Sequence, residues 1–152
     1  MFWRLNTMQQ GLLAALLFAL PAMAFGEEKD TPSPRSLYLT GHYAEAAEQY
    51  KQSADKDATS ALGLARCQTA TGEYDEAAKT LTEAIQREAR SAALLSEFAL
   101  LEFQRGREEA ARKHVEAALA LDKDSITARW TLAELDRTSG KLTDALKGYE
   151  SL

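Results

Sequence analysis

The sequence predicts an all-α fold, built as a solenoid of tandem antiparallel helix hairpins. The stretch 61–85, ALGLARCQTATGEYDEAAKTLTEAI, recurs with the same pattern as LLSEFALLEFQRGREEAARKHVEAAL at 94–119. Four glycines keep this register at spacings of 31, 34 and 34 residues, namely Gly41, Gly72, Gly106 and Gly140. No strand-like alternation appears after Arg35, and no proline follows Pro34 to interrupt a helix. Self-similarity at a period of this size is typical of a solenoid.

The apolar spacing and the turn residues place the helices in order along the chain. A glycine after each first helix supplies the left-handed residue that ends it, and small alanines let the two helices of a hairpin approach closely. Ser91, and either Asp124 or Ser125, are suited to cap the helices that follow them. Pro34 suits the first turn of the first helix. We therefore expect helices at about 35–40, 43–54, 58–70, 74–88, 91–104, 108–121, 125–138 and 142–152.

The repeated residues resemble the motif of the tetratricopeptide repeat family. The second copy matches it with Leu64-Ala65, Gly72, Tyr74, Ala77, Leu81 and Ala84, and the third with Leu95, Phe98-Ala99, Gly106, Ala111, Val115 and Ala118. The family's proline near the end of each repeat is missing, because Ala89 and Lys123 stand there. The resemblance covers about residues 35–152 and implies a right-handed α-solenoid that mediates protein–protein interaction.

The first 24 residues read as a secretory signal peptide. Arg4 precedes the apolar run GLLAALLFAL at 11–20, and Ala22-Met23-Ala24 has the small-residue pattern of a cleavage site. The run is shorter than the roughly 20 residues that a membrane span needs. We expect cleavage after Ala24 and an exported protein, periplasmic or secreted, with no stable membrane anchor after cleavage. The alternative is an anchor that is never cleaved.

The rest of the chain divides into a linker at residues 25–34 and a repeat domain at 35–152. Within that domain, the repeats are expected at about 35–57, 58–91, 92–125 and 126–152, the last one incomplete. The last helix would leave an apolar face without a following helix, formed by Leu142, Leu146, Tyr149 and Leu152. Repeat arrays usually cover such a face with a capping element. Either the chain is part of a longer protein, something else covers this face, or a frayed last helix is tolerated.

Charge and cysteine content limit the function. The net charge is −5, and it becomes −6 without Arg4, which argues against nucleic acid as a main partner. Cys67 is the only cysteine, so an internal disulfide is excluded, and we expect a packed, inert thiol.

The resemblance also implies which residues face the concave groove of the array. These are Leu62, Arg66 and Thr69, then Ser96, Leu100, Phe103 and Gln104, then Trp130, Glu134 and Arg137. We hypothesise that this groove binds an extended or helical peptide segment with Trp130 as an aromatic anchor. The alternative is that Phe103 and Trp130 only pack between neighbouring repeats.

The sequence contains no recognisable catalytic motif, so we expect no enzyme activity within this chain and no cofactor. His42 and His114 lie in different repeats without ligands at metal-binding spacing, so no metal site is expected. Acidic pairs such as Asp75-Glu76 stand in first helical turns, where they complement the helix dipole.

Three functions fit these observations. The first is an exported scaffold that binds an unidentified protein or peptide. The second is the N-terminal repeat module of a larger secreted enzyme, such as a hydrolase or peptidase, with its catalytic part beyond residue 152. The third is end-to-end self-association through the last helix.

Overall fold

The structure is a computed structural model that describes residues 32–152. The chain divides into two units, residues 1–31 and 32–152, and only the second is described below. The predicted signal peptide at 1–24 and most of the predicted linker lie outside the described residues. Those two predictions therefore stay predictions.

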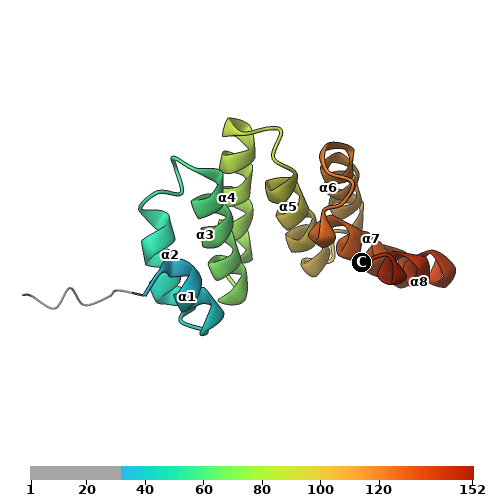
Figure 1. The fold of residues 1–152 in the computed structure, drawn as a ribbon, viewed down its shortest axis with the longest axis horizontal. Helices are drawn as coiled ribbons and strands as arrows, with labels where there is room; N and C mark the ends of the chain where they lie inside the picture. The colour runs from blue at the N-terminus through green and yellow to red at the C-terminus, as the bar shows by residue number, and fades with distance from the viewer. Residues whose placement is uncertain (1–31) are drawn as a thin grey trace, which may run out of the picture. The chain divides into compact units, whose positions relative to one another are not determined.

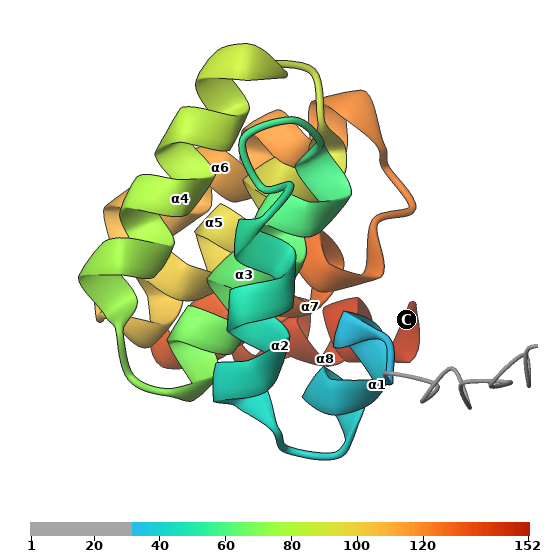
Figure 2. The same ribbon diagram turned by 90° about the vertical axis from the view of Figure 1, so that its left-hand side faces the viewer.

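The described residues form eight α-helices and no strand, which confirms the all-α fold. The helices follow one another as four antiparallel hairpins (Figures 1 and 2). Their bounds are α1 Pro34–Leu39, α2 Tyr43–Lys51, α3 Ala58–Ala70, α4 Tyr74–Arg87, α5 Ala92–Gln104, α6 Glu108–Leu121, α7 Ile126–Thr138 and α8 Leu142–Glu150. Consecutive helices pack together, and α3 also packs on α1 and α5, as α5 does on α7.

Most helix ends lie within one residue of their predicted positions, because glycines and caps set them locally. Gly72 has a φ of 83°, and the N–H of Glu73 donates to the carbonyl of Gln68 at 2.8 Å. This arrangement satisfies a carbonyl that the end of α3 would otherwise leave unpaired. Gly41, Gly106 and Gly140 also have positive φ angles, so all four repeat glycines adopt the predicted conformation.

Two local predictions need correction. The helix α2 ends at Lys51 instead of continuing to residue 54, because residues 52–56 form turns. Ser91 accepts from the N–H of Leu94 as expected, but Ser125 makes no side-chain cap, and α7 begins at Ile126. The Ser125 hydroxyl lies instead 2.8 Å from the hydroxyl of Ser96.

Each cluster of the core joins one hairpin to the first helix of the next. Leu81 and Leu94 are fully buried between α3, α4 and α5, and Val115 and Leu135 join α5, α6 and α7. Cys67 lies in the cluster of α1, α2 and α3, where it is fully buried, as expected, and burial raises the pKa of its thiol. The repeats are therefore held by contacts between neighbours along the array.

The last helix is the least covered. Ala145 is its only fully buried residue, while Leu142 and Leu146 are 67% and 57% exposed. Tyr149 departs from the expected exposed face, because its hydroxyl donates to Glu134 of α7 at 2.6 Å. This hydrogen bond holds α8 against α7.

Candidate functional site

The first helices of the hairpins, α1, α3, α5 and α7, form one continuous row. Two hollows lie along this row, and both are lined by Tyr38 and Arg66. The α3–α5 hollow has a volume of about 270 Å³ and is lined by Tyr38, Arg66, Thr69, Ala70, Tyr74, Glu97, Leu100, Leu101 and Gln104. The α1–α3 hollow has a volume of about 340 Å³ and is lined by Arg35, Tyr38, Leu39, Tyr50, Thr59, Leu62, Gly63 and Arg66. Because they share two residues, the hollows form one surface.

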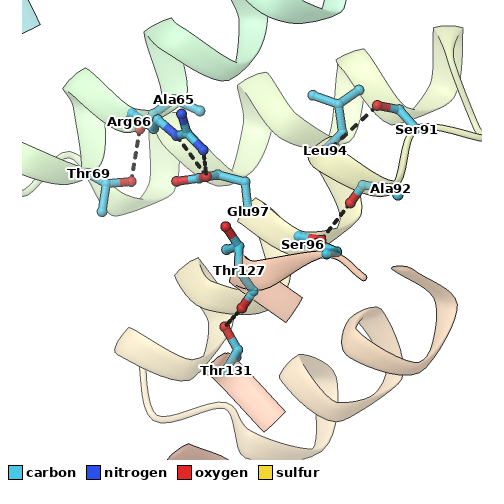
Figure 3. Close-up of polar contacts among 11 residues, drawn as sticks. Ala65, Arg66, Thr69, Ser91, Ala92, Leu94, Ser96, Glu97, Thr127 and Thr131 are labelled. Carbon is cyan, nitrogen blue, oxygen red and sulfur yellow. Dashed lines mark hydrogen bonds and ion pairs between the residues drawn. The ribbon is translucent and has the colours of Figure 1, made fainter. Parts of the chain in front are cut away.

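An ion pair between neighbouring repeats lies at the centre of this surface. Nε of Arg66 donates to Oε2 of Glu97 at 2.8 Å, and Nη2 of Arg66 forms an ion pair with the same oxygen at 2.7 Å (Figure 3). The side chain of Glu97 is 11% exposed, whereas that of Arg66 is 41% exposed. Burial opposes the charged guanidinium, but the hydrogen bond and the charge of Glu97 outweigh it and raise the pKa of Arg66. Arg66 is thus a fixed cation that is open to solvent.

Five of the predicted groove residues line the two hollows. They are Leu62, Arg66, Thr69, Leu100 and Gln104. They come from α3 and α5, which pack directly on each other.

The structure places two other predicted residues below this surface. Ser96 is 1% exposed, and its hydroxyl donates to the carbonyl of Ala92 at 2.7 Å (Figure 3). Phe103 is partly buried and packs against the core cluster that contains Val115 and Leu135. The Ser96 hydroxyl also lies 2.8 Å from the hydroxyl of Ser125 at the start of α7, so Ser96 joins neighbouring helices. Phe103 packs between repeats, as in the alternative considered for it above.

The three predicted residues of α7 lie outside both hollows. Trp130 is 38% exposed. Glu134 accepts hydrogen bonds from Tyr149 at 2.6 Å and from Arg137 at 2.7 Å. Both bonds lower the pKa of Glu134, and the bond from Tyr149 has the larger effect. Glu134 and Arg137 thus belong to the junction with α8. Trp130 and Arg137 are both exposed, and Glu134 is not.

Several residues of the surface were absent from the prediction. Arg35 and Tyr38 stand six and three residues before Gly41, as Arg66 and Thr69 stand before Gly72. Extending the repeat register to the first copy would therefore have found both. Burial raises the pKa of Tyr38, so its phenol stays a hydrogen-bond donor at neutral pH.

The remaining reactive side chains lie apart from this surface. His114 stacks on Phe98 with ring centroids 4.4 Å apart, and burial lowers its pKa. His42 lies at the turn before α2, with Nδ1 2.9 Å from the Thr40 hydroxyl. Among the described residues, no group of three or more His, Cys, Asp and Glu side chains could hold a metal ion. No helix in residues 32–152 is long and apolar enough to span a membrane.

Comparison with known proteins agrees with this geometry. A family model for the tetratricopeptide repeat matches residues 37–98. A thermophilic TPR protein of Thermus thermophilus superposes with a TM-score of 0.71 and 24% identity, over 77% of this chain and 67% of that chain. MamA superposes with a TM-score of 0.62 and 20% identity, over 78% of this chain and 71% of that chain. A search of curated proteins finds no match to the sequence.

The matches account for the features described above. Both solved structures share the fold of stacked helix hairpins, and the matched family segment begins in α1 and ends in α5. Tetratricopeptide repeats are typically non-catalytic scaffolds and generally bind protein partners. The glycine register, the buried alanines and these comparisons lead to one conclusion: residues 37–98 match the tetratricopeptide repeat family, and the described residues share the fold of solved tetratricopeptide repeat proteins.

Proposed function

We propose that this protein is an exported, non-catalytic scaffold that binds a peptide segment of another protein along α1, α3 and α5. The observation that carries this proposal is the continuous surface formed by the two hollows, which share Tyr38 and Arg66. Neighbouring hairpins pack around buried clusters, so the surface is preformed. A preformed surface avoids the ordering cost that would otherwise weaken binding.

The side chains of this surface suit peptide recognition. Leu62 and Leu100 offer apolar contact, Tyr38 and Tyr74 offer aromatic area, and Gln104 offers hydrogen bonds. Aromatic and arginine side chains carry much of the binding energy at protein interfaces. Trp130, farther along the row on α7, is proposed as an additional anchor.

The test uses a partner captured by cross-linking in the native compartment and a peptide derived from its contact region. Arg66→Ala alone would leave Glu97 buried without its partner, so the informative variant is Arg66→Gln with Glu97→Gln. We expect this double variant and Trp130→Ala each to weaken binding about tenfold or more in calorimetry. Ile126→Ala, at a 66% exposed apolar residue outside both hollows, should bind like the parent. Unchanged affinity in both groove variants, with native circular dichroism, would contradict the proposal.

Export is a separate part of the proposal and is supported by the sequence of residues 1–24. The intact mass of the native protein tests it, because cleavage after Ala24 leaves a chain that begins at Phe25. Within residues 25–152, Trp130 is the single tryptophan, since the other is Trp3. A much larger mass would favour the alternative, the N-terminal module of a larger secreted enzyme.

A second candidate function is end-to-end self-association through α8, favoured by the exposure of Leu142 and Leu146. Sedimentation over a range of concentrations tests it. Leu142→Glu with Leu146→Glu should abolish association without touching the hydrogen bond of Tyr149 to Glu134. A parent protein that is monomeric at every concentration would rule this function out.

A further inference from the structure

We infer that the partner segment is acidic and that its carboxylates bind in the α1–α3 hollow, on Arg35 and Arg66. This inference rests on the proposed peptide-binding function and adds the chemistry of the partner and its position along the row. It is based on the charged and hydrogen-bonding groups of this surface that remain available to a ligand.

The α1–α3 hollow is lined by donors. Arg35 and Arg66 both line it, together with Tyr38, Tyr50 and Thr59, which carry hydroxyl groups, and none of its lining residues is acidic. Burial raises the pKa of both tyrosines, so their phenols stay protonated donors. A carboxylate accepts several hydrogen bonds at once, which matches this set of donors.

The carboxylates on the first helices of the hairpins, which lie on α5 and α7, already form ion pairs within the protein. Glu97, Glu102, Glu134 and Asp136 have side chains that are only 11%, 6%, 15% and 14% exposed. Each of them pairs with an arginine at 3.5 Å or less. They therefore have little capacity to attract the lysines or arginines of a partner.

The arginines on this row keep capacity for a ligand. Arg66 donates one hydrogen bond, from Nε, to Glu97 and is still 41% exposed, and Arg35 is exposed. A guanidinium has five donors, so Arg66 can bind a second carboxylate while it holds Glu97. The charge that a partner meets at this end of the row is therefore positive.

The outer helices have the opposite balance. Each of α2, α4, α6 and α8 carries one more acidic than basic residue. Asp75 of α4, for example, has a side chain that is 91% exposed, even though it pairs with Arg105. An acidic segment is thus repelled from the outer helices and attracted to the α1–α3 hollow, which favours one docking position. The same acidic exterior disfavours a long polyanion such as nucleic acid.

Selection from a display library of random peptides of about 12 residues tests this inference without a known partner. The bait is the purified protein. We expect the recovered peptides to be enriched in Asp and Glu relative to the starting library. Arg35→Gln, which touches no buried carboxylate, should weaken the best peptide about tenfold or more. The double variant Arg66→Gln with Glu97→Gln should do the same, and Arg90→Gln, at an exposed arginine between α4 and α5, should not.

The outcomes separate the inference from the proposed function. Recovered peptides that depend on Trp130 but lack acidic enrichment would overturn the inference and keep the proposed function. Acidic peptides that bind both arginine variants as tightly as the parent would also overturn it. No enrichment of any peptide would overturn both. A parent dimer that dissociates in Arg35→Gln would assign the hollow to a second copy of the chain instead.

Salt dependence adds a second readout. Binding of the best acidic peptide should weaken steeply when NaCl rises from about 50 to about 500 mM, because screening acts on exposed charges. The Arg35→Gln variant should show a shallower dependence. Equal slopes for parent and variant would contradict a direct contact between Arg35 and the carboxylates.

Discussion

The central helix α5 and the last helix α8 are packed very differently. The helix α5 buries seven residues, among them Leu94, Leu101 and the charged Glu97 and Glu102, whereas α8 buries only Ala145. The difference comes from neighbours, because α5 packs on α3, α4, α6 and α7, while α8 packs on α7. In a repeat array, the contribution of a residue to stability therefore depends on whether both sides of its repeat are covered.

Truncation of a leucine should show this difference most strongly. Leu101 is 2% exposed in the cluster of α3, α4 and α5, and Leu146 is 57% exposed on α8. Leu101→Ala should destabilise the fold by about 3 kcal/mol, because it leaves a cavity, and Leu146→Ala by less than about 0.5 kcal/mol. Urea denaturation measures both values. Similar losses would show that α8 is covered in solution.

Two glycines within helices test the same difference in packing between the centre of the array and α8. A Cβ at Gly63 of α3 would lie 2.4–2.6 Å from the Tyr50 ring, and one at Gly148 of α8 would lie 2.9 Å from Cβ of Ala133. Gly63→Ala should cost about 1–3 kcal/mol, because Tyr50 packs against the core and must shift. Gly148→Ala should cost less, because α8 can move and alanine favours the helix by about 1 kcal/mol. Thermal unfolding ranks the two, and a larger loss for Gly148→Ala would contradict this explanation.

The N-terminal caps of α3 and α7 should also contribute unequally to stability, and we expect this difference to be smaller. Asp57 accepts from the N–H of Ser60 at 2.8 Å, whereas Ser125 makes no such cap. Asp57→Ala should lower the midpoint of urea unfolding more than Ser125→Ala, but less than Gly63→Ala does. Because the hydrogen bonds to Ser60 lower the pKa of Asp57, this difference should shrink below about pH 4. A pH-independent difference would exclude the charged cap.

The middle hairpin α5–α6 and the α7–α8 junction should also lose stability in different pH ranges. We expect this to be the smallest of the four effects. Burial lowers the pKa of His114 in α6, so the unfolded chain takes up the proton first, near pH 6.5, and stability falls as the pH drops further. His114→Gln should remove this slope, and His42→Gln should retain it. At the α7–α8 junction the hydrogen bonds from Tyr149 and Arg137 lower the pKa of Glu134, so its contribution is lost only below about pH 4.5. Urea midpoints measured from pH 7.5 to 4 test both windows, and a slope that survives in His114→Gln would assign it to another group.

The candidate surface was only partly predictable. The resemblance assigned Arg66, Thr69 and Leu100 to one face of the array, and in the structure these three residues line the same hollow, because residues at equal repeat positions share a helix face. It failed for Ser96, whose hydroxyl lies 2.8 Å from that of Ser125 at the start of the next repeat. A helix face can be derived from local spacing, but what covers that face depends on a segment about one repeat away.

The sequence by itself determined the helices, their glycine ends and the hairpin order, because each follows from local backbone preferences and apolar periodicity. The tertiary structure alone decided that Arg66 pairs with Glu97 across two repeats. It also decided that Tyr149 turns towards Glu134. These features depend on the distance and rotation between neighbouring hairpins, which are set by side-chain packing between residues about 15 to 31 positions apart.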